Sequence, residues 1–254
     1  MGRQLVTAAR DAGHDLSGGS EAPGSKFLGR DLGEIAGLAT IGAVAHAGMT
    51  EAGKDADVWI DFTVPSATLL ALSMLPSLGV KAAIIGTTGF SDTEGAQIKI
   101  AAERIAIVKA GNYSLGVNLL EALVRQAASR LGVDWDIEVL ETHHRRKIDA
   151  PSGTALMLGD AAANGRGKPL AELRTGPYDG PDAKREAGKI GFAVRRSGSV
   201  IGDHEVTFGS DMETVSLSHK ALDRAVFAHG AIKAAEWAAS QPPGLYDMSD
   251  VLGI

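Results

Sequence analysis

The chain has 254 residues, 44% of them hydrophobic and 22% charged, values that are typical of a globular protein and exclude a disordered or fibrous one. With 25 basic and 31 acidic residues the net charge is −6, so we expect no nucleic-acid partner and no binding to an anionic membrane. There is no cysteine, no signal-peptide pattern and no apolar run of membrane length, which excludes disulfides and thiolate sites and favours a cytoplasmic location.

The N-terminal half alternates short apolar runs with helical patterns. We predict a helix over residues 2–12 and then three strands, each followed by a short polar turn and a helix. The strands span 57–62, 80–85 and 105–108, and the helices after them span 66–78, a segment that begins near 91, and 114–131. Three strand–turn–helix units with short connections predict a doubly wound parallel sheet, with helices on both faces.

The C-terminal half has a different pattern. We predict strands over 133–144, 190–196, 200–208 and 214–219, and helices over 152–163 and 222–239, with a polar, Gly- and Pro-containing stretch over 164–189. These elements predict a second α+β domain with a mixed, mostly antiparallel sheet, so the fold class is α/β. We expect one domain to comprise 1–114 with 222–254, and the other to comprise 115–221.

The segment Glu141–Ala155 carries the densest set of reactive side chains. It contains five consecutive basic side chains in an acidic chain, followed by Pro151 and then by Ser152, a favoured helix N-cap. A solvated basic turn is the simplest interpretation of the cations. The first backbone N–H groups of the predicted helix, those of Ser152, Gly153 and Thr154, argue against it, because they form an anion site at a positive helix end. We therefore expect this segment to bind a carboxylate or a phosphate.

Two side chains of this segment are suited to proton transfer. His143 can donate or accept a proton near neutral pH, and Lys147 is protonated there. Glu141 and His143 share one face of the predicted strand, so a metal site built on them is an alternative. We expect no metal, because three adjacent cations oppose a metal ion and no further ligand cluster is evident.

A second candidate site is distributed over three loops. Each loop directly follows one of the predicted parallel strands: Asp61-Phe62-Thr63, Gly86-Thr87-Thr88-Gly89 and Ala110-Gly111-Asn112-Tyr113. Because the carboxyl ends of parallel strands meet at one edge of a sheet, ligands of doubly wound sheets bind there. Three ordinary turns are the alternative, but two glycine-containing loops with small polar groups favour a cofactor edge.

These residues together resemble the dihydrodipicolinate reductase family. The segment 141–155 matches a long Glu-x-His-His-Arg-x-Lys-x-Asp-Ala-Pro-Ser-Gly-Thr-Ala signature, and this length makes the match specific. The segments 86–90 and 112–118 resemble the family's two nicotinamide-side loops. The resemblance covers essentially the whole chain and includes residues 61–63, 196–204 and 244–248.

The resemblance implies an NAD(P)H-dependent reductase of the diaminopimelate route to lysine, which converts an unsaturated cyclic imine dicarboxylate to tetrahydrodipicolinate. It implies a Rossmann-like domain, and a mixed sheet that assembles a homotetramer. His143 and Lys147 would be the acid–base pair, with Lys147 donating the ring proton, and the substrate carboxylates would be held by His144, Gly153 and Thr154. The implied cofactor residues are Met1, Glu21, Gly86, Thr87, Thr88, Ala110, Gly111, Asn112 and Tyr113.

The front of the sequence departs from this family. The family begins with a strand and a glycine-rich loop that grips the cofactor pyrophosphate, and only Met1-Gly2-Arg3 of that loop remains here. We therefore expect that Met1 is an internal methionine taken as a start, or that the chain is truncated.

The choice between the two cofactors rests on one acidic position. Glu21 matches the family's ribose-binding acid, and Ala22 stands where a basic residue often recognises a 2′-phosphate. This favours NADH slightly, although Lys26 or Arg30 could reach the phosphate. Two other functions are considered: a different two-domain nicotinamide dehydrogenase, which leaves the segment 141–155 unexplained, and a cofactor-free assembly or regulatory protein.

Overall fold

The computed structural model describes residues 1–254, and the chain divides into two compact units. The first contains Met1–Ser114 and Ala225–Gly253, and the second contains Leu115–Arg224. Each unit has its own sheet and its own buried core. None of the helices combines the length and the apolar character that crossing a membrane would require.

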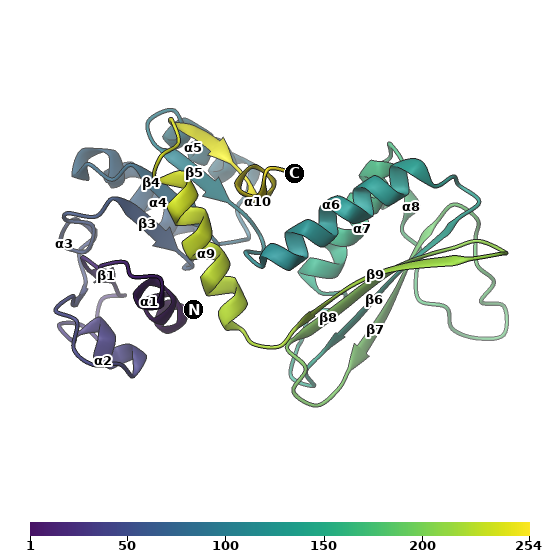
Figure 1. Ribbon diagram of the computed structural model, residues 1–254, viewed down its shortest axis with the longest axis horizontal. Coiled ribbons are helices and arrows are strands. Elements are labelled where there is room, and N and C mark those ends of the chain that lie inside the picture. Colours follow the sequence, from purple (N-terminus) through teal and green to yellow (C-terminus); the bar gives the residue numbers. More distant parts are fainter. The chain divides into compact units, whose positions relative to one another are not determined.

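The first unit is built on a four-stranded sheet in which every pair of neighbours is parallel (Figure 1). Its strands, in spatial order, are β10 (Gly244–Tyr246), β5 (Ala106–Lys109), β4 (Ala82–Ile85) and β3 (Val58–Asp61). The three predicted parallel strands are thus confirmed. β10 was not predicted, because three residues after a proline pair carry too little pattern to indicate a strand.

Helices cover both faces of this sheet, which confirms the doubly wound prediction. Alternate strand residues point to opposite faces, so β4 packs Ala83 and Ile85 against one helix layer and Ala82 and Ile84 against the other. The first layer contains α4 (Pro65–Met74), the 3-10 helix η1 (Leu75–Leu78) and α5 (Asp92–Ala102). The second contains α1 (Gly2–Asp11), α9 (Ala225–Ala238) and α10 (Met248–Leu252).

The remaining elements of the first unit are short. The strands β1 (Gly19–Ser20) and β2 (Ala45–His46) pair in parallel and form a separate two-stranded sheet. The short helices of this region are α2 (Leu32–Ala36) and α3 (Met49–Ala52). None spans more than five residues, which is too short for a hydrophobic period to be recognised in the sequence.

The second unit is built on a mixed sheet with the order β7-β6-β8-β9 (Figure 1). The strands are β6 (Asp136–His143), β7 (Ile190–Arg196), β8 (Gly202–Gly209) and β9 (Thr214–Ala221). The pairs β6/β8 and β8/β9 are antiparallel, as predicted for most of the sheet. β7 and β8 are joined by a short turn but do not pair, because β6 lies between them and pairs with β7 in parallel.

Helices α6 (Leu115–Arg130) and α7 (Gly153–Gly165) lie side by side on one face of this sheet. Their apolar residues form one core with strand residues such as Val139 and Phe208. The predicted 164–189 stretch contains the single turn α8 (Leu170–Leu173). The Arg166 guanidinium anchors the start of this stretch by donating to the carbonyls of Gly132, Trp135 and Gly188.

Candidate functional site

One face of strand β6 changes from apolar to polar along its length. Ile137 and Val139 lie in the core beneath α6 and α7, and the next two residues with the same orientation are Glu141 and His143. The antiparallel register sets His204 of β8 opposite Glu141. All three polar residues are buried. The alternation of the strand thus delivers a carboxylate and two imidazoles to the carboxyl end of β6.

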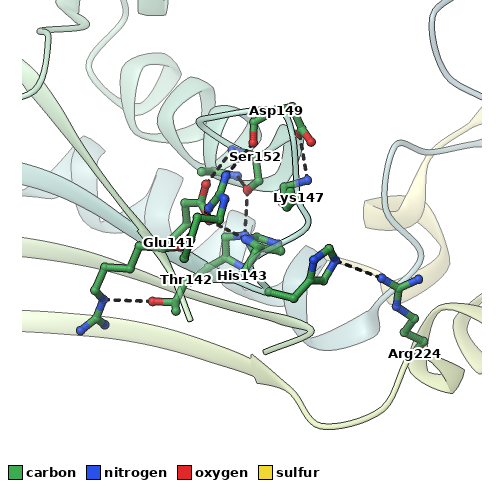
Figure 2. Close-up of polar contacts among 12 residues, drawn as sticks. Glu141, Thr142, His143, Lys147, Asp149, Ser152 and Arg224 are labelled. Carbon is green, nitrogen blue, oxygen red and sulfur yellow. Dashed lines mark hydrogen bonds and ion pairs between the residues drawn. The ribbon is translucent and has the colours of Figure 1, made fainter. Parts of the chain in front are cut away.

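The Glu141 carboxylate is the centre of this cluster (Figure 2). One oxygen, Oε2, accepts hydrogen bonds from His143 Nδ1 and from Arg196 Nη1, the latter at 3.0 Å. The other, Oε1, accepts from the backbone N–H of Ser152 at 3.1 Å. Burial alone would raise the pKa of Glu141, but the hydrogen bonds from His143 and Arg196 outweigh burial and lower it. The carboxylate is therefore ionised and fully paired.

Ser152 connects this cluster to helix α7. It is the N-cap of α7, and its hydroxyl accepts from the Ala155 N–H at 3.1 Å, as predicted from the sequence. The same hydroxyl lies 3.0 Å from Nε2 of His204. Burial lowers the pKa of His204 to about 4, so its ring is neutral at pH 7.

The expected anion site at the start of α7 needs one correction. The Ser152 N–H was predicted to face a ligand, but it donates to Glu141 instead, because β6 brings that carboxylate to the helix end. Gly153 is exposed, and a Cβ placed on it would meet nothing within 4 Å. Gly153 and Thr154 thus remain the predicted ligand positions at this positive helix end.

His144 points to a different neighbour from His143. Its Nε2 lies 3.3 Å from Nη2 of Arg224, the residue just before α9 (Figure 2). A guanidinium only donates, so Nε2 of His144 accepts, and the proton of the neutral ring is assigned to Nδ1. Burial, followed by the charges of Arg146 and Arg224, lowers the pKa of His144. His144 is therefore a neutral hydrogen-bonding group beside an arginine.

Lys147 lies in the loop between β6 and α7. Its ammonium is 2.8 Å from Oδ2 of Asp149 (Figure 2). The Lys147 side chain is 20% exposed, while Arg145 and Arg146 are exposed. The same loop is held from the other side by Arg196, whose Nη2 donates to the Asp149 carbonyl at 2.6 Å. The loop therefore keeps Lys147 in one place beside the end of β6.

In the first unit the predicted loops follow β3, β4 and β5 at the carboxyl edge of the parallel sheet. The buried Asp61 carboxylate ties two of them together: it accepts from the hydroxyls of Thr63 at 2.6 Å, and of Thr68 and Thr87 at 3.0 Å each. The Thr87 hydroxyl is therefore occupied within the protein, while Thr88 beside it is exposed.

The other predicted cofactor residues differ in what they expose. Gly111 is exposed with open space where a Cβ would lie, whereas a Cβ on Gly86 would lie 2.1 Å from the Phe62 ring. Tyr113 is 1% exposed, and its hydroxyl lies 2.9 Å from the carbonyls of both Ile85 and Val108. Its side chain is thus a core residue rather than a cofactor-lining one, because its long apolar body fills the space under α9. Predicted ligand positions Ala110 and Asn112 are half-buried.

Three cations lie around the ring of Phe27, in the segment that follows the predicted ribose-binding Glu21. Glu21 directly follows β1, and its N–H donates to the carbonyl of His46 in β2. Close by in the chain, the Phe27 ring has Arg3 Cζ and Lys26 Nζ each at 5.3 Å from its centroid and Arg30 Cζ at 6.0 Å. Met1 is the N-cap of α1 and is exposed.

Four residues of the second unit's cluster were not predicted to belong to it. They are Asp149, Arg196, His204 and Arg224. His204 lies in the predicted strand 200–208, and the alternation of β8 could have placed it on the face of Val206 and Phe208. The resemblance includes Arg196 in the segment 196–204 but gives it no role, and no sequence signal places Arg224, because the distance of both residues from the site depends on the tertiary fold.

Comparison with known proteins gives matches over both units. The family profile described as Dihydrodipicolinate reductase, N-terminus, matches residues 1–113, and that described as Dihydrodipicolinate reductase, C-terminus, matches residues 116–252. A 4-hydroxy-tetrahydrodipicolinate reductase from Parvibaculum lavamentivorans is 52% identical over 256 residues, covering 100% of this chain and 94% of the relative. The enzyme of that name from Afipia carboxidovorans is 51% identical, covering 100% and 93%.

A solved structure has the same fold. Dipicolinate-bound dihydrodipicolinate reductase from Paenisporosarcina sp. TG-14 matches with a TM-score of 0.74 and 22% identity, covering 96% of this chain and 92% of that one. GenD2 from gentamicin A biosynthesis, solved with NAD, matches with a TM-score of 0.55 and 14% identity, covering 99% and 83%.

Proposed function

The chain belongs to the dihydrodipicolinate reductase family and reduces 4-hydroxy-tetrahydrodipicolinate to tetrahydrodipicolinate with NAD(P)H in lysine and diaminopimelate biosynthesis, and we propose that Lys147 and His143 are the acid–base groups of this reaction. The observation that carries this assignment is the β6–α7 loop. It holds the paired Lys147 ammonium beside the end of β6, where His143 is fixed by Glu141.

The first unit binds the cofactor at the carboxyl edge of its parallel sheet. The exposed backbone at Gly111 and the exposed Thr88 leave room for a ligand, which fits the approach of a dinucleotide to this edge. Bound NAD(P)H supplies the hydride. The Asp61 hydroxyl network keeps the loops after β3 and β4 in fixed positions for that ligand, with Thr87 as the bridging residue.

The second unit binds the dicarboxylate. We assign one carboxylate to the N–H groups of Gly153 and Thr154 at the positive end of α7, where a 13-residue helix dipole favours an anion. His144 is assigned as a further carboxylate-binding group, since its pairing with Arg224 places a guanidinium next to it. These cations and dipoles account for a dianionic substrate being bound by an acidic protein.

Hydride addition leaves excess electron density on the substrate ring, which must then gain a proton. Lys147 Nζ is our choice for the donor, because its ion pair with Asp149 holds it in one position beside the end of β6. His143 is assigned to proton exchange in the same step, with Nε2 as the exchanging atom, because Nδ1 is bonded to Glu141.

Three further assignments, of cofactor preference, oligomeric state and location, rest on the family resemblance. We propose a slight preference for NADH, because Ala22 follows Glu21, and a homotetramer in the cytoplasm. Helices cover only one face of the second unit's sheet, which leaves the other face available for pairing with further copies. Light scattering on the purified protein tests the tetramer, and a monomeric mass at micromolar concentration would refute it.

The activity is tested with freshly generated 4-hydroxy-tetrahydrodipicolinate, by following the loss of NADH or NADPH absorbance. We expect turnover that depends on the dicarboxylate and is absent when the substrate is omitted. NADH binding, measured by fluorescence, distinguishes this reductase from a cofactor-free assembly protein. A cofactor-free protein would give no binding signal.

A further inference from the structure

Glu141 is almost completely buried, with 1% of its side chain exposed. Burying a carboxylate costs folding free energy unless the carboxylate is fully hydrogen-bonded. The hydrogen-bond partners of Glu141 therefore indicate its role in the site. Three donors meet it: His143 Nδ1 and Arg196 Nη1 on one oxygen, and the Ser152 N–H on the other. His143 is the residue assigned above to proton exchange, and Ser152 directly precedes the residues assigned to substrate binding.

The first consequence concerns the tautomer of His143. An ionised carboxylate can only accept, so Nδ1 of His143 must carry a proton, and Nε2 is left as the atom that exchanges one. Space around Nε2 is kept open by Gly202, because a Cβ there would lie 3.0 Å from this nitrogen. The neighbouring His204 ring stacks edge-on at 5.1 Å between centroids and limits rotation of the His143 ring.

The second consequence concerns the end of helix α7. The Ser152 N–H is one of the first backbone donors of the helix, and Glu141 satisfies it from strand β6. The same carboxylate therefore fixes both the His143 ring and the helix end that precedes Gly153. The negative charge of Glu141 lies close to the proposed carboxylate-binding site and is offset by the guanidinium of Arg196. The other amino group of Arg196 donates to the Asp149 carbonyl and holds the loop.

We infer that Glu141 is a positioning residue that couples the two halves of the substrate site, by fixing the tautomer of His143 and the N-terminal end of α7 through one carboxylate. This inference rests on the proposed function for its catalytic consequence, but its structural content does not depend on turnover.

The test is Glu141→Gln, which keeps the shape and removes the charge. A glutamine offers one accepting oxygen and one donating amide, so it cannot satisfy three donors, and at least one contact must be lost. We expect kcat/KM for the dicarboxylate to fall roughly 10–100-fold, with NADH affinity unchanged. The matched control is Glu138→Gln on the same strand, where the carboxylate accepts from Arg185 and Tyr178 on the opposite face. It should keep wild-type kinetics.

A spectroscopic measurement separates positioning from loss of fold. In ¹⁵N-histidine-labelled protein, the neutral form of the His143 ring should carry its proton on Nδ1 and leave Nε2 bare. In Glu141→Gln this bias should be lost, while thermal unfolding stays cooperative. A protonated Nε2 in the wild-type protein, or a Gln variant within twofold of wild-type kcat/KM, would overturn the inference. If the wild-type protein shows no turnover but the expected tautomer, the proposed function fails and the positioning role stands.

Discussion

Lys147 Nζ and Asp149 Oδ2 lie 2.8 Å apart, although only one residue separates them in the chain. The lysine is largely buried while the aspartate is exposed, so the pair holds an ammonium inside the loop and its counter-ion at the surface. This relationship supports the proposed role of Lys147 as proton donor, because the ion pair holds its side chain in one position, and it defines the first prediction.

Lys147→Ala should lower kcat about 10²–10⁴-fold, the usual contribution of a positioned general acid. NADH affinity should be unchanged, because the assigned cofactor residues belong to the other unit. Steady-state kinetics and NADH fluorescence titration check both parts. Lys168→Ala, at an exposed position after α7, serves as the control, and near-normal turnover of Lys147→Ala would refute the proton-donor role.

The buried His204 predicts a pH dependence of stability. Its pKa is lowered by burial to about 4, so between pH 6.5 and 4 the unfolded chain binds a proton that the folded chain does not. Stability is therefore fully present above pH 6.5 and is lost as the pH falls. At pH 5 this group alone should cost about 2 kcal/mol of unfolding free energy.

Urea unfolding at pH 7.5 and pH 5 measures this loss directly. His204→Gln should reduce the difference between the two pH values by about 2 kcal/mol, whereas His229→Gln, at an exposed position of α9, should leave it unchanged. An unaltered pH dependence in His204→Gln would show that this ring is not the titrating group.

Two glycines of the cofactor loops should respond differently to alanine. Gly86→Ala places a methyl group 2.1 Å from the Phe62 ring, and we expect a loss of about 1–3 kcal/mol in stability. Gly111→Ala meets open space, so stability should change by less than about 1 kcal/mol while NADH affinity falls about tenfold. Chemical unfolding and fluorescence titration separate the two effects. Unchanged NADH binding in Gly111→Ala would remove this glycine from the site.

The cations around Phe27 allow the cofactor preference to be tested. We expect wild-type kcat/KM to be modestly higher with NADH than with NADPH. Replacing both Lys26 and Arg30 by alanine should lower kcat/KM for NADPH about tenfold, as expected for the loss of phosphate contacts, and leave that for NADH unchanged. A strong NADPH preference of the wild-type protein would refute the proposed lean towards NADH.

Strong local patterns predicted most of the fold. The strands β3, β4 and β5 were recognised as short apolar runs before polar turns, and α6 as a helix over 114–131, because burial imposes a period on the sequence. The partner of β7 was not predicted. β7 pairs in parallel with β6, with Ile190 opposite Ile137, and no local pattern indicates a pairing between segments so far apart in the chain.

The sequence by itself determined the order of the longer elements, the basic segment 141–155 and the family, because these depend on neighbouring residues and on motif spacing. Only the tertiary structure decided how those side chains are used. In it the Ser152 N–H donates to Glu141, the Tyr113 side chain is buried in the core, and Arg196 donates to the Glu141 carboxylate. Contacts of this kind depend on strand register and on helix placement, and no local pattern in the chain records either of them.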